Sequence, residues 1–326
     1  MQAFSKSLVE LYDAAIYTDI CDYPQQMLKI IKQLIDFDGA VLGTGRVRTM
    51  QPPDLIIEQA HVINRDIAIL DDYAHVSAKD AVTHMFTRGL DCPLALDCEA
   101  FYVAKQDSAM RHFVQHHAIN HLLLFGSKPD QERDAQWLVL YRGAGKPFEQ
   151  KDKAYLIALW PHLLRAIGIN FTNCLSSHLI QQSDSAAALI NRTGSVEVAT
   201  TCFRKMLTME WPDWQDREQN KLPDQMIQAC MAATSYAGSV VNFVMNRQGD
   251  YVVCVATRRS KLMVLTPTEN FVLLRFASGL SHKKIAQITG SSQNTIRSHI
   301  AHGYAKLGIH NKASLANLFS LTYNAS

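Results

Sequence analysis

The stretch SSQNTIRSHIAHGYAKLGIHNK, residues Ser291–Lys312, lies near the end of a chain of 326 residues. Its apolar residues recur at the three- and four-residue spacing of one helix face: Ile296, Ile300, Tyr304 and Leu307. Hydrogen-bonding side chains crowd into barely two turns between them, and the stretch contains no acidic residue. The pattern predicts a helix with one face in a hydrophobic core and a polar, cationic face outside.

The helix that precedes this stretch is bounded by capping residues in LTPTENFVLLRFASG, residues 265–279. Thr266 is placed as the N-cap, Pro267 suits the first helical position, and Glu269 completes a capping box. Gly279 supplies the left-handed residue that ends the helix. The buried stripe is expected to contain Val272, Leu273, Phe276 and Ala277.

Three further capping signals divide the terminal segment into four helices. Ser281 opens a second helix, whose apolar residues are expected to face inward: Ile285, Ala286 and Ile288. Gly290 permits a tight turn, Ser292 caps the third helix, and Asn311 caps a fourth. Two helices joined by a short glycine-containing turn form a helix-turn-helix, whose second helix enters the major groove of DNA.

The polar face of the third helix suits duplex DNA. Its N-terminal end has unpaired N–H groups and a partial positive charge, which favour a phosphate. Arg297 can present two donors to guanine, and Asn294 or Gln293 can pair with adenine. The candidate DNA-binding residues of this helix are Gln293, Asn294, Thr295, Arg297, Ser298, His299 and Ala301, and the candidate lysine contacts to the DNA backbone are Lys283, Lys284 and Lys306.

Charge separates the terminal segment from the rest of the chain. From Leu265 onward there are six Lys or Arg residues and one acidic residue, Glu269, which gives a formal charge of +5. The whole chain carries +2, so residues 1–264 carry −3. This asymmetry predicts a polyanionic partner for the terminal segment alone. On periodicity alone, a merely solvated polar face in a helical bundle fits equally well.

The terminal segment resembles the LuxR-type helix-turn-helix, found in quorum-sensing regulators and many response regulators. The matching stretches, in the family's order and spacing, are LTPTENFVL, GLSHKKIA, TIRSHI and KLGIHNKA. The resemblance implies that Arg297, Ser298 and Ala301 approach bases, while Thr295 and His299 lie near the backbone. It also implies dimerisation through the last helix. The candidate interface residues are Leu315, Leu318 and Phe319, and a place in the domain's own core is an equal alternative for them.

Four positions depart from the LuxR-type pattern. Thr268 stands where the family usually has arginine, and Thr289 and Ser291 replace apolar residues in the turn. Gly303 falls inside the third helix, where glycine costs about 1 kcal/mol relative to alanine. The fold is expected to survive these changes.

The first 262 residues read as two α+β segments. Residues 137–167, WLVLYRGAGKPFEQKDKAYLIALWPHLLRAI, resemble the closing part of a GAF-like sensor domain, and Pro161 is expected to bend or interrupt their helix. Residues 187–203 and the hairpin around NRQGD resemble a shortened PAS fold. The expected architecture is multidomain: a GAF-like α+β sensor domain at 1–165, a helical linker at 166–182, a PAS-like α+β domain at 183–262, and an all-α four-helix LuxR-type domain at 263–326.

Histidines and cysteines raise the question of a metal, haem or redox site. Four of the thirteen histidines cluster, and the first two are an i, i+4 pair: His112, His116, His117 and His121. No HExxH motif occurs, and Cys92 and Cys98 have unsuitable spacing for a zinc knuckle. Surface imidazoles are therefore the preferred interpretation, and neither a metal nor a cofactor is assigned. A redox role for the cysteines is a minor alternative.

Catalysis and membrane insertion are not expected. The chain has no P-loop, no GxSxG, no GxGxxG after a strand and no kinase signature, and GTGR at residues 43–46 is too short for a phosphate cradle. No leader-like start is recognised, and YLIALW is too short to span a bilayer. Seven scattered cysteines fit reduced thiols in a cytoplasm.

These patterns predict a cytoplasmic, dimeric, one-component transcription regulator that binds double-stranded DNA and responds to a small-molecule or protein signal. One alternative is an acyl-homoserine-lactone receptor, favoured only by YAHVSAKDAV at residues 73–82, because the pocket tryptophan, tyrosine and aspartate of such receptors are not recognised at workable spacing. The other is a ligand-independent regulator whose first 262 residues serve as a platform for dimerisation or protein interaction.

Overall fold

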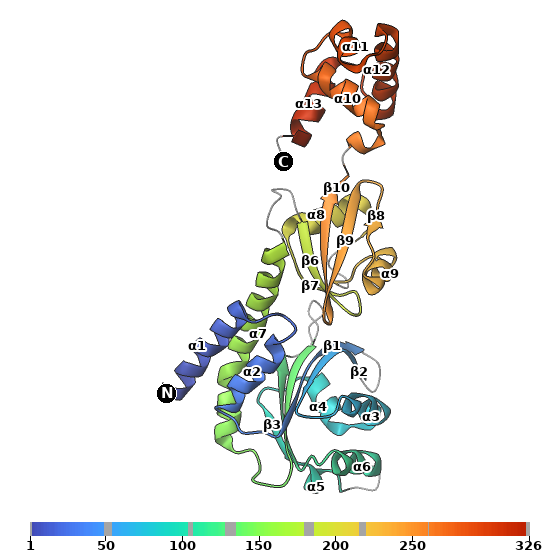
Figure 1. Ribbon diagram of the computed structural model, residues 1–326. Helices are drawn as coiled ribbons and strands as arrows, with labels where there is room; N and C mark the ends of the chain where they lie inside the picture. Colours follow the sequence, from blue (N-terminus) through green and yellow to red (C-terminus); the bar gives the residue numbers. More distant parts are fainter. Residues whose placement is uncertain are drawn as a thin grey trace.

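The computed structural model describes residues 2–48, 54–103, 107–127, 135–178, 186–214, 220–259 and 261–323. Along the chain these form two α+β units and a helical head, arranged as three tiers (Figure 1). The last part of the expected linker, 179–182, lies outside the described residues. Within the described ranges, no helix combines the length and apolar composition needed to cross a membrane.

The first unit is built on a five-stranded antiparallel sheet with the order β2-β1-β5-β4-β3. Its strands are β1 (Gly39–Arg48), β2 (Asp54–Ile63), β3 (Leu94–Asp97), β4 (His121–Ser127) and β5 (Ala135–Arg142). The neighbouring strands β4 and β5 pair antiparallel, from His121 opposite Arg142 to Ser127 opposite Gln136. Along β4 and β5, neighbouring residues point to opposite faces, so the sheet supplies two hydrophobic cores.

Helices cover both faces of this sheet. One face packs against α1 (Gln2–Tyr17), α2 (Tyr23–Lys32) and α7 (Gln150–His178). The other packs against a group of shorter helices: α3 (Ala68–Val76), the 3-10 turn η1 (Ser77–Lys79), α4 (Ala81–Arg88), α5 (Cys98–Phe101) and α6 (Ser108–His116). This second group encloses the larger cavity described below.

The helix α7 runs without interruption through Pro161, so the expected interruption there is wrong. Proline removes one helical hydrogen bond and leaves the carbonyl of Ile157 without its usual donor. Pro161 and Ile157 are both exposed, so water can reach that carbonyl. On the opposite side, Trp160 and Leu163 are buried in the core, and their burial stabilises the helix across the proline.

The second unit repeats the strand order of the first. Its five-stranded sheet runs β7-β6-β10-β9-β8, which is the order 2-1-5-4-3 in the unit's own numbering. The strands are β6 (Ala186–Asn191), β7 (Val196–Ala199), β8 (Tyr236–Ala237), β9 (Val241–Gln248) and β10 (Tyr251–Arg258). The hairpin expected around NRQGD joins β9 to β10, and Gly249 takes a left-handed φ of 58° in its turn. The sequence shows no repeat, yet the backbone topology does.

The two faces of the second sheet are covered differently. The helices α8 (Thr201–Glu210) and α9 (Asp224–Ala232) cover one face. The other face packs against the C-terminal part of α7 through Leu175 and against Ile20, from the segment between α1 and α2. Figure 1 shows α7 extending from the first sheet toward the second. A separate small hydrophobic cluster therefore joins α7 and the segment between α1 and α2 to the second sheet.

The head follows the short 3-10 segment η3 (Lys261–Val264) and is wholly helical. Its helices are α10 (Pro267–Ala277), α11 (His282–Thr289), α12 (Gln293–Leu307) and α13 (Lys312–Tyr323). The expected α+β units and four-helix head are confirmed at this level. Neither a GAF-like nor a PAS-like identity is established by these observations, and both stay predictions.

The capping residues expected in the head occupy their predicted positions. Thr266 and Glu269 form the capping box, and Asn311 Oδ1 accepts from the amide of Ser314 at 2.8 Å. One core prediction is wrong, because Ile288 is 50% exposed. It lies near the C-terminal end of α11, where no neighbouring helix covers its side of the stripe.

Gly303 has a packing role that the sequence did not reveal. A Cβ built at this position would lie 2.3 Å from Leu273 Cδ1 on α10. Both residues are buried. The glycine therefore permits the close approach of α12 to α10, which offsets its poor helix propensity.

Candidate DNA-binding face and ligand cavity

The helix-turn-helix is formed by α11 and α12. Gly290 follows α11 in the left-handed conformation, with φ 65° and ψ 21°, which glycine adopts without steric cost. Ser292 then caps α12, with its hydroxyl accepting from the amide of Thr295 at 3.1 Å. Ile296, Ile300 and Leu307 point into the core of the head, as predicted. The turn and the core contacts together fix which face of α12 is outside.

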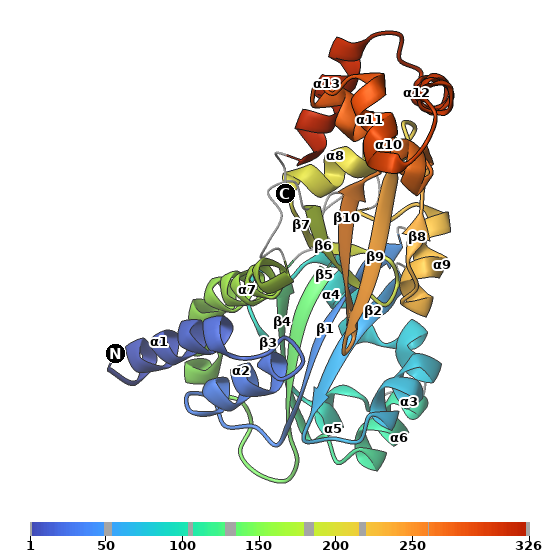
Figure 2. The same cartoon turned by 45° about the horizontal axis from the view of Figure 1, so that its top comes forward.

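That outer face contains the predicted DNA-contacting residues. All but one of the seven candidates on α12 are exposed, and His299 is half-buried. Lys283 and Lys284 are exposed on α11. Figure 2 views α12 nearly along its axis at the edge of the head. Among the described residues, no ion pair engages Arg297, Lys283 or Lys284, so their charges are available to a polyanion.

Lys306 is placed differently from the other candidate cations. Its Nζ donates to Glu269 Oε2 at 2.7 Å, so it ties α12 to the capping box of α10. This hydrogen bond, with that from the Thr266 amide, lowers the pKa of Glu269 to about 2. The Lys306 side chain is 39% exposed, and its ion pair with Glu269 offsets part of its charge inside the head.

The three residues considered for dimerisation lie in the core of the head. Leu315 and Phe319 are 0% and 3% exposed, and Leu318 is half-buried and packs against the same cluster. The core alternative that the sequence left open therefore describes Leu315 and Phe319. A surface for dimerisation through α13 would have to use its other residues.

A cavity of about 80 Å³ lies in the first unit, between the sheet and helices α3, α4 and α6. Its wall is mostly apolar, with Ile69 from α3, Phe86 from α4 and Phe113 from α6. Trp137 from β5 also lines it and packs edge-on against Phe86, with ring centroids 5.8 Å apart. Gly43 makes room for this indole, because a Cβ there would lie 2.3 Å from Trp137 Cε2.

Asp80 is the polar centre of the cavity wall and is 2% exposed. It caps α4 by accepting from the amides of Val82 at 3.0 Å and Thr83 at 3.3 Å. It also accepts from the hydroxyls of Tyr73 at 2.7 Å and Tyr102 at 2.8 Å. Donors of this number satisfy a buried carboxylate, which would otherwise be costly.

The tyrosines around Asp80 are held in their neutral, donating form. Burial, followed by the charge of Asp80, raises the pKa of Tyr73 and of Tyr102 well above their usual range. Burial also raises the pKa of Tyr141, in the same wall. The cavity therefore presents an apolar surface with one hydrogen-bonded carboxylate, Asp80.

The sequence did not identify this set of residues. YAHVSAKDAV contains Tyr73 and Asp80, but it was only a weak indication of a lactone-receptor pocket. Tyr102 and Trp137 come from distant segments, and only the fold brings them to the same cavity. The N-cap pattern of Asp80, followed by the amphipathic α4, is the one local signal that could have marked this aspartate.

A second cavity, of about 40 Å³, lies where the first sheet, α7 and the second sheet meet. Three buried polar atoms in its wall have no hydrogen-bond partner among the described residues: the hydroxyls of Tyr23 and Thr44, and Oδ1 of Asn170. Nearby, Arg46 Nη2 pairs with Glu58 Oε1 at 2.8 Å and donates to Ser195 Oγ at 3.1 Å. The junction of the two units is therefore polar and only partly satisfied by the chain itself.

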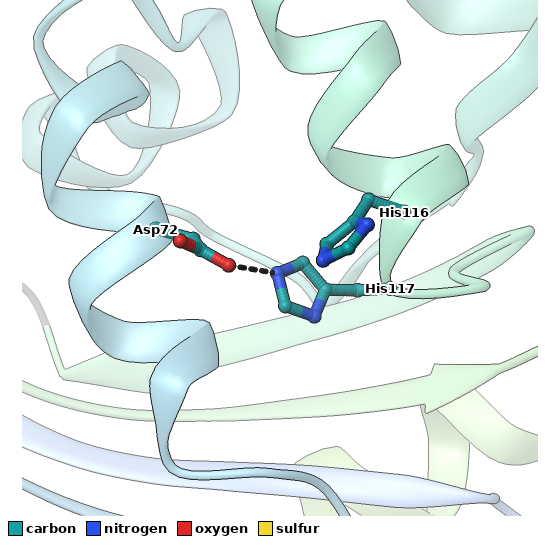
Figure 3. A group of neighbouring side chains, drawn as sticks. All are labelled: Asp72, His116 and His117. Carbon is teal, nitrogen blue, oxygen red and sulfur yellow. Dashed lines mark hydrogen bonds and ion pairs between the residues drawn. The ribbon is translucent and has the colours of Figure 1, made fainter.

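Three of the four clustered histidines stay neighbours at the end of α6, and His121 lies apart on β4. His112 and His116 are exposed on α6, with stacked rings 6.3 Å apart. His121 is buried on β4, and its Nδ1 lies 3.8 Å from Asp97 Oδ2. His116 and His117 instead meet Asp72 of α3, a residue that the sequence pattern did not include (Figure 3).

The two cysteines considered for a redox role differ in environment. Cys92 is exposed, whereas Cys98 is 1% exposed. Burial, aided by the charges of Asp97 and Asp80, raises the pKa of the Cys98 thiol to about 12. A thiol in this state is a poor nucleophile, which argues against a redox pair.

Comparison with solved structures finds distant likenesses. Escherichia coli SdiA aligns over 99% of both chains, with 12% identity and a TM-score of 0.40. CepR2 of Burkholderia cenocepacia, described as an N-acylhomoserine lactone dependent LuxR family transcription factor, aligns over 56% of this chain and 99% of its own, with 16% identity and a TM-score of 0.38. The LBD domain of Pseudomonas aeruginosa VqsR aligns over 53% and 99%, with 13% identity and a TM-score of 0.36. At these scores the likenesses carry no inference about this chain.

A family model gives a firmer assignment for part of the chain. No curated protein matches the sequence. Residues 263–319 match the model described as bacterial regulatory proteins, luxR family. The match covers the head down to Phe319 and leaves both sheet units outside it. The head is therefore a luxR-family helix-turn-helix domain, as the resemblance of its sequence to that family implied.

Proposed function

We propose that this protein is a transcription regulator that binds double-stranded DNA through α12 and responds to a small molecule in the first unit. The observation that carries the DNA-binding part is the exposed face of α12, which presents Arg297 with hydrogen-bonding side chains and without an acidic residue. Arginine in this position can read guanine, and the exposed lysines of α11 can contact phosphates. The protein would act by binding and not by catalysis, in the cytoplasm, where it meets chromosomal DNA.

Fluorescence anisotropy with labelled duplexes, first selected from a random pool by the full chain, tests this proposal. Arg297→Ala should weaken binding to the selected duplex by about 1–3 kcal/mol and relax the preference at one base pair. Lys283→Ala should weaken all duplexes about equally and reduce the salt slope by about 1. Arg165→Ala, at an exposed site on α7, is the matched control and should change neither. Unchanged selectivity in Arg297→Ala would show that α12 is assigned the wrong face.

The proposed dimer follows from the geometry of DNA reading. Two copies of α12 can read neighbouring major grooves only if the heads are related by a two-fold axis and the half-sites lie about one turn apart. We expect a pseudo-palindromic site, and sedimentation of the protein–duplex complex gives the stoichiometry. The domain limits at 165, 182 and 262, and the GAF-like and PAS-like character of the two sheet units, belong to the same proposal.

The small-molecule part rests on the 80 Å³ cavity with its single polar centre at Asp80. An apolar wall with few polar groups is the usual composition of a ligand site. The ligand class that fits is an apolar molecule with one hydrogen-bonding group. The void is about half of an engineered cavity of about 150 Å³ that admits benzene, so a larger ligand must move α3, α4 or α6 outward.

Native mass spectrometry of the freshly purified full chain tests for such a ligand. Val139→Phe fills the cavity wall on the central strand β5 and should eliminate a bound mass. Val255→Phe, at a half-buried position of the equivalent strand β10, is the matched control and should retain it. Adding N-octanoyl-homoserine lactone to ligand-free protein tests the lactone-receptor alternative. A wild-type chain that neither carries a mass nor binds the lactone would favour the ligand-independent platform.

A further inference from the structure

Asp72 on α3 and two histidines at the end of α6 bring three metal-ligating atoms together on the surface of the first unit (Figure 3). Each residue offers one ligand atom, and these atoms lie within 4.8 Å of one another. His117 Nε2 lies 3.0 Å from Asp72 Oδ2, and the rings of His116 and His117 meet edge-on at 4.8 Å. We propose that Asp72, His116 and His117 form a zinc-binding site.

The donor set selects the class of ion. Two imidazole nitrogens and one carboxylate oxygen suit zinc and its transition-metal neighbours, whereas calcium and magnesium take oxygen ligands. Three protein ligands leave a fourth tetrahedral position for water. Asp72 and His116 are exposed, so an ion can enter directly from solvent.

The geometry is close to what zinc requires. Ligand atoms at 2.0–2.1 Å from a tetrahedral ion lie about 3.3–3.4 Å apart. The pair His117 and Asp72 is within a few tenths of an ångström of that separation. The remaining distances are at most 4.8 Å and can close by rotation of the exposed side chains of His116 and Asp72.

His117 is the fixed member of the group. Its ring packs against Phe113 with centroids 4.7 Å apart, and its side chain is 11% exposed. His117 also ends α6 in a non-helical conformation, with φ −89° and ψ 10°, which turns its ring toward α3. Zinc would therefore bind to one pre-positioned imidazole and recruit two mobile ligands.

An ion at this site would join two helices that enclose the larger cavity. Tyr73, the residue after Asp72, and Phe113, one turn before His117, both line that cavity. Zinc would resist the separation of α3 from α6 that a large ligand requires. The metal site itself does not depend on the proposed regulator function, because zinc binding is measurable without DNA or ligand.

The test uses the full chain, free of affinity tags and stripped with a chelator. Zinc alone is titrated against a chromophoric chelator that reports free ion. Wild type should bind one zinc ion at this site. The substitutions His116→Ala, His117→Ala and Asp72→Asn should each lower the zinc affinity by at least about tenfold, because the loss of a residue that only hydrogen-bonds to a metal ligand already has an effect of this size. The stoichiometry of zinc bound elsewhere on the chain should not change.

Two controls are matched to the proposed ligands. His112→Ala removes an exposed imidazole one turn away on α6, and Asp71→Asn removes the exposed carboxylate next to Asp72. Both should bind zinc as wild type does. His117→Ala removes a ring that packs on Phe113, so His116→Ala and Asp72→Asn, whose side chains are exposed, decide the outcome if that variant is unstable. Equal zinc affinity in wild type and these two variants, or no zinc binding by wild type, would overturn the site.

Discussion

The two sheet units have the same strand order but different interiors. In the first unit, the strand β1, next to the central strand β5, carries Gly39, Gly43 and Gly45, and the larger cavity lies between the sheet and its short helices. In the second unit, the equivalent strand β6 carries Ala186, Ala187 and Ala188, all fully buried. A shared backbone topology therefore does not decide whether a unit has room for a ligand. In the first unit, the room lies between the sheet and the helices α3, α4 and α6.

The units also differ in where they place their carboxylate centres. Asp80 lies inside the first unit and accepts from two tyrosine hydroxyls and the first turn of α4. Glu210 lies near the surface of the second unit and accepts from the amides of Val240 at 2.8 Å and Val241 at 3.0 Å. One carboxylate organises a cavity, and the other holds the turn that leads into β9.

The largest expected effect comes from removing the buried centre. Asp80→Ala deletes the N-cap of α4 and leaves two tyrosine hydroxyls without their acceptor, so it should destabilise the first unit by about 3–5 kcal/mol. Asn191→Ala removes the buried polar residue of the second unit's first turn, whose Oδ1 accepts from Ser195 N at 3.0 Å, and should cost about 1–2 kcal/mol. Urea unfolding of the full chains compares the two. Equal losses would contradict the contrast between the units.

The next effect tests the glycines of β1. Gly43→Ala places a methyl group against the Trp137 indole, which should cost about 1–3 kcal/mol and shift the tryptophan fluorescence. Ala187→Gly, in the equivalent strand β6, removes a methyl group and should cost about 1 kcal/mol without that shift. A Gly43→Ala protein with wild-type fluorescence would show that the indole does not depend on this glycine.

A smaller effect is expected at Glu210, and it should depend on pH. Burial alone would raise the pKa of this carboxyl, but backbone N–H donors from Ser239 to Val241 outweigh it and lower the pKa below its usual 4.5. The carboxylate therefore stabilises the second unit above about pH 4.5, and that contribution is lost as the pH falls further. Glu210→Gln should lower the urea midpoint at pH 7 and narrow its difference from wild type at acidic pH. A difference that grows on acidification would contradict this sign.

The smallest effect concerns the junction between the units. The Tyr23 hydroxyl is buried without a partner among the described residues, so Tyr23→Phe should be neutral or stabilising by up to about 1 kcal/mol. Tyr102→Phe makes the same chemical change at a hydroxyl bonded to Asp80 and should destabilise by about 1–2 kcal/mol. Thermal unfolding of both variants gives the comparison. A destabilised Tyr23→Phe would indicate that the 40 Å³ cavity holds a molecule bonded to that hydroxyl.

The helical head could be predicted from the sequence because its signals are local. Capping and turn residues contact groups only three or four positions away, so they are sufficient to place the helices: Thr266, Glu269, Gly290 and Ser292. The prediction from periodicity that Ile288 is buried was wrong, because the spacing of apolar residues shows which helix face is apolar but not how much of that face a neighbouring helix covers. The cost assigned to Gly303 likewise omitted its contact with Leu273.

The cavity and the metal-ligating group could not be predicted because their members are distant in sequence. Tyr102 is 22 residues from Asp80, and Asp72 is 45 residues from His117. Histidine spacing suggested the pair His112 and His116, whereas the end of α6 turns His117 toward α3 instead. Contacts of this kind depend on how helices pack on the sheet, which no local pattern specifies.

The 29-residue helix α7 also sets the orientation of the second unit relative to the first. The helix is buried against the first unit at Leu156 and Leu163 and against the second sheet at Leu175. Deleting one residue between these anchors would turn everything beyond it by about 100° and shorten the helix by about 1.5 Å. Deleting seven, close to two full turns, would nearly restore the original heading. The number of residues between Leu163 and Leu175 therefore determines the rotation of the second unit about the axis of α7.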